Sequence, residues 1–247
     1  ALEVFIYRDT VSVKNSRGID KTEIRYRAMV EAIPTWNGAD ESVELYECYN
    51  FTEFDAATVT AEIATRMNEV RDRLAAKAPE KKLTCPVVLG APELETLFES
   101  LAHELGFAGV YNHTAAFAVG DDIQKEAVCD RATVTMCAAV KGSVRSAAFD
   151  VDGTALVDAE VIRDGRAVGL FGSARYASYI GKKPTGNLGC IRVETGTATD
   201  AELKGAPYFR CASMSGLQLD IYNDYIGGEV RLAYYFDGER EIPVTGI

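Results

Sequence analysis

Alternation of apolar and polar residues with a period of two constrains the fold more than any other feature of this sequence. Residues 20–33 alternate in this way, with Tyr26 and Val30 among the apolar positions, and residues 43–49 follow the same pattern. Period-two patterning is typical of half-buried strands. Residues 36–38 read Trp-Asn-Gly, which is a turn signal, so we expect the two runs to form a hairpin with a long loop.

The second half of the chain has the same character. From residue 132 onward, alternating stretches are separated by Asp-Gly or Gly-Gly pairs, which favour tight turns. These pairs occupy residues 152–153, 164–165, 227–228 and 237–238.

Three segments have helical spacing instead. The first follows Asp55, a good N-cap residue, and is stopped by Pro79. The second opens at Pro92 and ends at Gly106, and the third covers about residues 173–180. Runs of strands around about three helices predict an α+β fold with largely antiparallel sheets.

Length and composition fit one globular domain. The chain has 247 residues, of which 47% are hydrophobic, and no linker or repeat divides it, so we predict a single domain over residues 1–247. No apolar run approaches the roughly 20 residues that span a bilayer, and no secretory signal is visible. We therefore expect a cytoplasmic protein with no membrane partner. Its first residue is Ala, which we interpret as processing or as a fragment of a longer protein.

Charge and cysteine usage exclude two further classes. The net charge of −11 repels phosphate backbones, so nucleic acid is not an expected partner. The six cysteines include no Cys-x-x-Cys pair, which excludes zinc-ribbon spacing and favours buried free thiols.

One hexapeptide has the form of a catalytic motif. Residues 149–154 read Phe-Asp-Val-Asp-Gly-Thr, similar to the motif of haloacid-dehalogenase-type phosphatases, in which Asp150 would be the nucleophile and Asp152 the acid/base beside magnesium. The preceding residues 141–146 are too polar for a central parallel strand, and residues 161–168 predict a hairpin where the phosphatase needs a helix. We favour a simple β-turn at the Asp-Gly pair and keep the phosphatase as an alternative.

Several further segments, among them Pro-Val-Val-Leu at residues 86–89, occur in a characteristic order. Residues 13–18 contain an Asn-Ser-x-Gly strand-turn, and residues 56–77 form the first predicted helix. Residues 161–165 end in a charged-Gly turn, a short helix follows, and residues 185–187 read Thr-Gly-Asn. Residues 236–244 read as a closing hairpin with Asp-Gly before Pro-Val. This order resembles the bacterial TldD/PmbA family of peptide-maturation metalloproteases, also described as modulators of DNA gyrase. The resemblance implies the fold of that family's C-terminal domain, with its N-terminal domain absent.

The resemblance also implies a metal site, which this chain has only in part. Active members carry His-Glu-x-x-x-His on a helix and a later Cys, so that zinc activates a water with the Glu as base. Here His103 and Glu104 are present, but Ala108 stands in the place of the second His. His113 lies too far along the chain to share the helical turn, and Cys211 lies in the region of the late Cys.

The function implied most directly is that of a PmbA (TldE)-type subunit without its own metal or other cofactor. It would pair with a TldD-type paralogue, or with a second copy, and bind a peptide or unfolded polypeptide by strand addition. We expect the exposed edge of residues 229–235 to be covered by the paired subunit. Three alternatives remain: a metallopeptidase with zinc on His103, His113 and Cys211 and Glu104 as base, a binding module without catalysis, and the phosphatase.

Overall fold

The computed structural model describes residues 1–247, and the chain forms two compact units. Unit 1 comprises Ala1–Ile6, Ala28–Thr96 and Ala198–Ile247, and unit 2 comprises Tyr7–Arg27 and Leu97–Thr197. Compactness does not decide whether two units unfold together, so the single domain over residues 1–247 stays a prediction.

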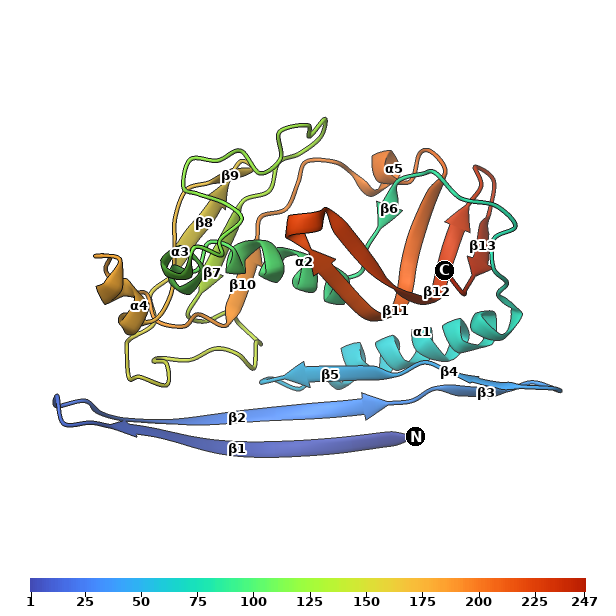
Figure 1. The fold of residues 1–247 in the computed structure, drawn as a ribbon. Coiled ribbons are helices and arrows are strands. Elements are labelled where there is room, and N and C mark those ends of the chain that lie inside the picture. The colour runs from blue at the N-terminus through green and yellow to red at the C-terminus, as the bar shows by residue number, and fades with distance from the viewer. The chain divides into compact units, whose positions relative to one another are not determined.

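Figure 1 labels the elements of both units. Unit 1 contains β3 (Thr35–Asn37), β4 (Ser42–Glu44), β5 (Glu47–Phe51), α1 (Ala56–Ala75), β6 (Val87–Val88), α5 (Asp200–Leu203), β11 (Tyr208–Asp220), the 3-10 helix η1 (Ile221–Asn223), β12 (Tyr225–Phe236) and β13 (Glu241–Val244). Unit 2 contains α3 (Phe107–Asn112), β7 (Val134–Cys137), β8 (Ala159–Arg163), β9 (Arg166–Ala167), α4 (Ala174–Tyr179) and β10 (Cys190–Val193). Three elements have residues in both units: β1 (Leu2–Lys14), β2 (Asp20–Ala32) and α2 (Ala91–His103).

The predicted fold class is confirmed. The strands form sheets with the orders β1-β2-β5, β3-β4, β10-β7-β8-β9 and β13-β12-β11-β6, and β6 beside β11 is a parallel pair among antiparallel ones. The three predicted helices are α1, α2 and α4, and two short helices, α3 and α5, were not predicted.

The main sheet of unit 1 is built around the long antiparallel pair of β11 and β12. Gly227 and Gly228, predicted to form a turn, lie within β12, so that prediction is wrong. The two strands come close at a register shift between Ser215 and Gln218, and a Cβ at Gly228 would lie only 3.1 Å from the Cα of Leu217. The two glycines therefore allow β11 and β12 to approach closely and do not form a turn.

β12 is an interior strand, which corrects the prediction of an exposed edge over residues 229–235. It pairs with β11 on one side and with β13 on the other, because the predicted closing turn at Asp237 and Gly238 brings the chain back. The sheet ends instead at β6 and at β13. Pro243 in β13 has no N–H to offer a further strand, which protects that edge.

The hairpin predicted near the N-terminus is present. β2 pairs with β5 in antiparallel register, with Val30 opposite Tyr49. Its long connection forms a smaller hairpin of its own, β3 and β4, in which Trp36 lies opposite Val43.

α1 begins where the sequence predicts. The carboxylate of Asp55 accepts hydrogen bonds from the N–H groups of Ala57 (3.0 Å) and Thr58 (3.3 Å), as an N-cap does. The helix lies between the β3–β4 hairpin and the main sheet of unit 1 (Figure 1), and each large apolar side chain that it buries there stabilises the fold by about 1.5–3 kcal/mol. The cluster it joins contains Val43, Leu45, Val70, Leu232 and Tyr234.

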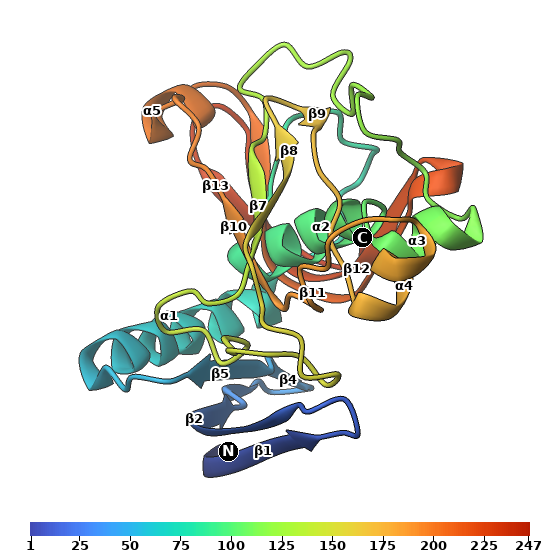
Figure 2. The same ribbon diagram turned by 90° about the vertical axis from the view of Figure 1, so that its left-hand side faces the viewer.

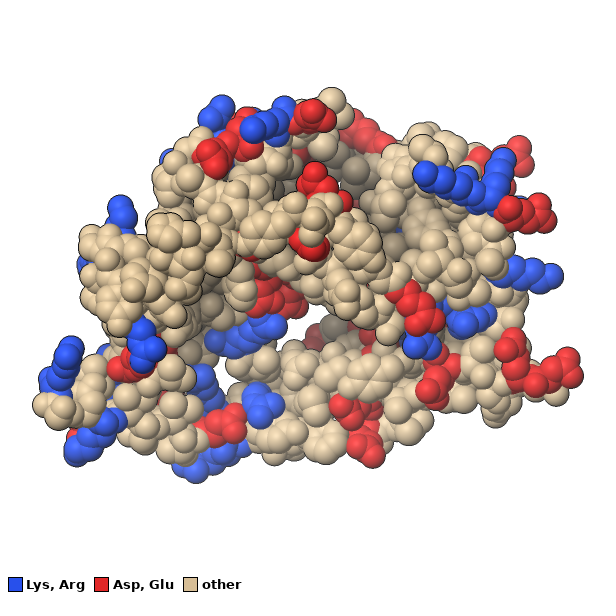
Figure 3. Space-filling model, viewed as in Figure 1, with Lys and Arg blue, Asp and Glu red and all other residues tan.

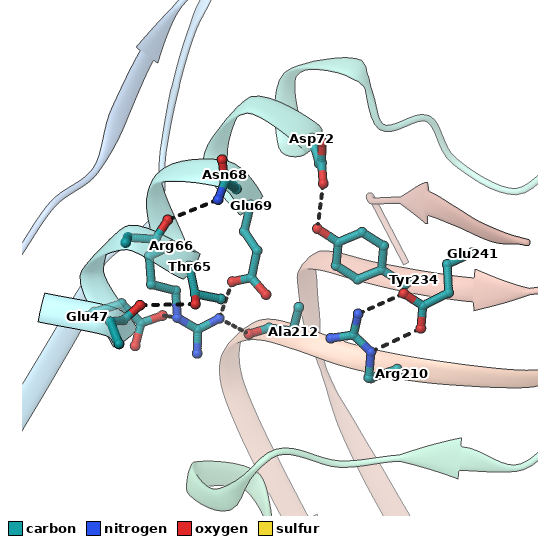
Figure 4. Close-up of polar contacts among 12 residues, drawn as sticks. Glu47, Thr65, Arg66, Asn68, Glu69, Asp72, Arg210, Ala212, Tyr234 and Glu241 are labelled. Atoms are coloured by element: carbon teal, nitrogen blue, oxygen red, sulfur yellow. Dashed lines mark hydrogen bonds and ion pairs between the residues drawn. The ribbon is translucent and has the colours of Figure 1, made fainter. Parts of the chain in front are cut away.

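A part-buried arginine lies beside this apolar contact. The side chain of Arg66 in α1 is 19% exposed, and its guanidinium forms ion pairs with Glu47 of β5 (3.0 Å) and with Glu69 (Figure 4). It also donates a hydrogen bond to the carbonyl oxygen of Ala212 in β11 (2.9 Å). Burial raises the pKa of Glu47 above its ordinary value, and the neighbouring Arg66 opposes this shift. A single guanidinium thus joins a helix to strands of two sheets.

A second polar group lies nearby in unit 1. The hydroxyl of Tyr234 donates to Asp72 of α1 (2.8 Å), and the guanidinium of Arg210 lies 4.4 Å from the centre of the Tyr234 ring (Figure 4). Arg210 donates two hydrogen bonds to Glu241, at 3.3 Å and 3.0 Å, and the hydroxyl of Tyr208 donates a third at 2.7 Å. These bonds connect β11, β12 and β13.

Unit 2 is built on the sheet β10-β7-β8-β9, with α3 and α4 side by side at one end (Figure 2). β8 and β9 are joined by Asp164 and Gly165, whose φ angles of 46° and 68° form the two-residue turn that the sequence predicts. The buried core of this unit consists of Ala102, Leu105, Val134, Met136, Val161, Ile162, Ala167, Phe171 and Leu188.

Surface charge and cysteines agree only partly with expectation. On the face drawn in Figure 3, Lys and Arg side chains are most frequent over the β1–β2 hairpin and are interspersed with Asp and Glu elsewhere. None of the helices has the length and apolar character to cross a bilayer. All six cysteines are free, as predicted, but Cys48 and Cys129 are exposed and not buried.

Replacing Arg66 by Met is expected to destabilise unit 1 by about 3–5 kcal/mol, because Glu47 and Glu69 would remain largely buried without a counter-charge. Urea unfolding followed by circular dichroism measures the loss. Arg71, an exposed arginine of the same helix, is the matched control, and Arg71→Met should change the free energy of unfolding by less than about 0.5 kcal/mol. Adding Glu47→Gln and Glu69→Gln to Arg66→Met should restore most of the loss, and failure of this rescue would contradict the electrostatic cause.

The stability of unit 1 is expected to fall in acid partly through Glu241. Hydrogen bonds from Arg210 and Tyr208 lower the pKa of Glu241 below its ordinary 4.5. A lowered folded-state pKa contributes stability above the unfolded value, and this contribution is lost as pH falls through the folded value. Glu241→Gln should therefore be less stable than the wild type at pH 7 and lose less stability below pH 4.5, measured by thermal unfolding across pH. Parallel pH profiles for the two proteins would contradict the assignment.

Candidate binding cleft and the predicted metal ligands

α2 ends at His103 because the chain crosses another segment there. The carbonyl of Leu105 accepts a hydrogen bond from Phe171 N–H (3.2 Å), and Phe107 N–H donates to the carbonyl of Phe171 (2.8 Å). Gly106 between them is the N-cap of α3, and a Cβ at this position would lie 3.0 Å from the His103 carbonyl oxygen. The crossing therefore fixes where one helix stops and the next begins.

A cavity of about 490 Å³ opens beside this crossing, and all the residues that line it belong to unit 2. A volume of this size is in the range that binds small ligands or a few residues of a peptide. Phe107 and Phe171 supply aromatic surface. The polar lining comes from His103, Asp152, Ser173, Arg175, Tyr176 and Asn187.

Gly172 brings the two walls of this cleft together. Its φ is 149°, and a Cβ there would lie 3.1 Å from the Cβ of Phe107, so a larger residue would push the wall apart. The Gly172 N–H donates to the hydroxyl of Thr185 (2.9 Å), and Gly172 also forms a β-bridge with Gly186. The start of α4 is thereby held against the Thr-Gly-Asn element of residues 185–187.

The phosphatase-like segment, residues 149–154, contributes Asp152 to the lining of the same cleft. Asp150 is buried, and its Oδ1 accepts hydrogen bonds from the N–H groups of Asp152 (3.0 Å) and Thr154 (2.9 Å). Its Oδ2 accepts a third from Asn187 N–H (3.1 Å), while Gly153 N–H closes the predicted β-turn on the Asp150 carbonyl (2.9 Å). The carboxylate that a phosphatase would use as nucleophile is thus occupied by backbone donors and shapes the cleft.

The cleft presents two side chains of opposite charge. Asp152 and Arg175 are exposed in the same cavity, and neither belongs to an ion pair of this structure. No hydrogen bond joins His103 to the hydroxyl of Ser173, so a nucleophile and base are not paired. Tyr176 extends the aromatic surface toward Tyr111 and Tyr179, and the centres of these three rings are 4.9–6.1 Å apart.

The four residues predicted for a rearranged zinc site lie in both units. His103 is exposed where α2 ends, and His113 is exposed at the C-cap of α3 with a φ of 57°. Glu104 is engaged, because its Oε2 accepts a hydrogen bond from Ala116 N–H at 2.7 Å. Cys211 lies in β11 of unit 1, where burial raises the pKa of its thiol to about 11 and keeps it protonated at neutral pH.

These residues do not fit the helical zinc motif. Ala108, at the place of the second His, lies on α3 and not on α2. No group of three or more His, Cys, Asp and Glu side chains is arranged to hold a metal ion. Zinc on His103, His113 and Cys211 stays a prediction.

Comparison with known proteins decides the family. Residues 82–247, more than half of the chain, match the model of the PmbA/TldA metallopeptidase C-terminal domain. The chain belongs to the PmbA/TldA metallopeptidase family. This agrees with the resemblance inferred from the order of the sequence segments, whereas a search of curated proteins gives no match.

Solved structures with the PmbA/TldA fold resemble this one. TldE from Thermococcus kodakarensis has a TM-score of 0.76 at 15% identity, over 92% of this chain and 55% of that one. Candidate modulators of DNA gyrase from Thermotoga maritima and Bacteroides thetaiotaomicron have TM-scores of 0.76 and 0.72 at 13% and 14% identity, over 98% and 93% of this chain. The chain spans 53–58% of the length of these three structures, and at such identities the likeness shows the fold alone.

Sequence reasoning missed most of the cleft in this PmbA/TldA chain. The sequence predicts that Arg175 and Tyr176 lie on a helix but does not indicate that they line a cavity. The Gly-Ser pair before α4 and the Thr-Gly-Asn element were visible signals, because closely spaced glycines often mark a close approach of two backbones. Nothing local to the sequence indicates that Phe107 and Phe171 meet.

Replacing Asp150 by Ala is expected to destabilise unit 2 by roughly 2–4 kcal/mol, because three backbone N–H groups would lose a charged acceptor. Amide hydrogen exchange at Thr154 and Asn187 should accelerate together. Asp152→Ala is the matched control, since the exposed Asp152 side chain supports no such bond, and its unfolding curve should overlay that of the wild type. Unchanged exchange in Asp150→Ala would show that the carboxylate does not hold the wall.

Proposed function

We propose that this PmbA/TldA-family chain is a metal-poor, non-catalytic subunit that acts in peptide processing together with a metallopeptidase partner. The observation that carries the proposal is the hydrogen bond from Ala116 N–H to the Glu104 carboxylate. A zinc peptidase needs this glutamate free to activate a water beside the metal. Here the carboxylate secures the loop after α3 instead.

The arrangement around Glu104 supports the same conclusion. Two histidines bind one zinc ion from a helix when both lie on the same helical face. The crossing of Leu105 and Phe171 stops α2 at His103, so the helix does not reach the position of a second ligand. Burial raises the pKa of the Cys211 thiol, so a zinc ion would have to displace its proton at a higher cost than at an exposed cysteine.

The cleft of unit 2 supports a role in binding peptide. Its aromatic walls accept apolar side chains, and Asp152 and Arg175 offer opposite charges to a main chain or its termini. The substrate would be a peptide or an unfolded polypeptide. A TldD-type paralogue with the complete His-Glu-x-x-x-His motif would supply the metal in a heterodimer, and a homodimer is the second possible assembly.

Elemental analysis of protein purified without chelator tests the metal-poor assignment, with His103→Ala as the comparison. We expect no stoichiometric zinc in either protein. About one zinc per chain, lost in His103→Ala, would overturn the proposal and favour the rearranged metallopeptidase with Cys211 as the next residue to replace.

Hydrolysis of an unfolded polypeptide tests the partnership. The chain alone should be inactive, and mixing it with a TldD-type paralogue should give activity and a complex of higher mass in size-exclusion chromatography. Activity of this chain alone, or paralogue activity that is indifferent to its presence, would contradict the proposed role.

A further inference from the structure

A second cavity lies in unit 1, apart from any residue discussed as a metal ligand or as a wall of the cleft. Its volume is about 440 Å³, and Leu83, Cys85 and Phe209 are among its apolar lining residues. Val87 of β6 also lines it. A cavity with this lining accepts an apolar side chain.

Two lysines give the cavity a charged rim. Lys81 and Lys82 line it, both are exposed, and neither takes part in an ion pair of this structure. Glu80, the acidic residue before them, is not among the lining residues, whereas Gly246 and Ile247, the last residue of the sequence, are. No ion pair joins Ile247 to either lysine, so both ammonium groups remain available to an anion. Because the chain carries a net charge of −11, two adjacent unpaired lysines stand out as a place where an anion is attracted.

The neighbouring strand offers main-chain hydrogen bonds. β6 is the last strand of the main sheet, beside β11 (Figure 1), and Val87 is 58% exposed. The carbonyl of Pro86 accepts a hydrogen bond from Phe209 N–H (2.9 Å) on the β11 side. Since consecutive residues of a strand point their N–H and C=O groups to opposite sides, those of Val87 point away from β11, toward a further strand.

We propose that this cavity binds the C-terminal segment of an apolar peptide, with its last side chain in the cavity and its carboxylate beside Lys81 and Lys82. The peptide would run along β6 and bond to the main chain of Val87. A C-terminal residue fits because it carries a carboxylate and a side chain on the same carbon atom. A fatty acid shares the anion and the apolar tail but has no main-chain groups for the edge of β6. The proposal rests on the proposed function in peptide processing and gives that function a chain-end preference.

Fluorescence anisotropy with the wild-type chain alone tests this site. The probe is a fluorescein-labelled hexapeptide of alternating threonine and valine that ends in leucine, compared with the same peptide as its C-terminal amide. We expect the amide to bind about tenfold more weakly, which corresponds to about 1.4 kcal/mol. Equal affinity of acid and amide, or no binding of either peptide, would overturn the proposal.

Two variants locate the binding on the structure. Lys81→Ala with Lys82→Ala should abolish the difference between acid and amide. Lys182 and Lys183, two adjacent exposed lysines of unit 2, provide the matched double-alanine control, which should preserve it. Val87→Pro removes an N–H that faces away from β11, and it should weaken the acid and the amide alike.

Competition by dodecanoate separates the two sources of an apolar carboxylate. If the fatty acid binds and the peptide does not, the peptide assignment is wrong. Because these measurements use neither metal nor partner, their failure leaves the zinc and hydrolysis experiments unaffected, and failure of those experiments leaves the binding result standing.

Discussion

The part-buried guanidinium of Arg66 is the constraint on which unit 1 depends. It meets Glu47 of β5, Glu69 of α1 and the Ala212 carbonyl of β11, so one side chain needs three elements in place at once. Removing an arginine from water is costly in free energy unless such partners are present. A displaced α1 would leave the guanidinium without them and would therefore be disfavoured. Apolar burial of Val70 and Leu232 drives the packing, and the ion pairs select one position of the helix on the sheet.

In unit 2, the corresponding constraint is the crossing of two backbones. The hydrogen bonds between Phe171 and its neighbours Leu105 and Phe107 end α2 and start α3. Gly172 allows the close contact, and the buried carboxylate of Asp150 holds the opposite wall through Asn187. The cleft is therefore a consequence of main-chain bonding, and its polar side chains are presented on a rigid frame.

Membership of a metallopeptidase family and the chemistry of this chain are separate matters. The family is decided by residues 82–247 as a whole, whereas catalysis would depend on a few atoms around His103 and Glu104. Of these, the Glu104 carboxylate accepts a hydrogen bond from Ala116 N–H. A paired subunit can keep a family fold for enclosing substrate while the reaction takes place on its partner, and this is the division of labour that we propose.

Local signals predict many of the elements, because period, caps and turn pairs act over a few residues: Asp55 begins α1 and Asp164-Gly165 closes a hairpin as predicted, whereas the short helices α3 and α5 have no such signal. Which faces are covered depends on the tertiary structure. In β2, Val30 is buried and Tyr26 is exposed although both belong to the same apolar alternation, and Lys21 of the polar face donates to the Gly153 carbonyl (2.8 Å). The position of Gly227 within a strand, the part-buried ion pairs of Arg66 and the hydrogen bond between Phe107 and Phe171 also depend on the tertiary structure. These outcomes depend on contacts between residues far apart in the sequence, and a local pattern does not indicate which distant residues will be in contact.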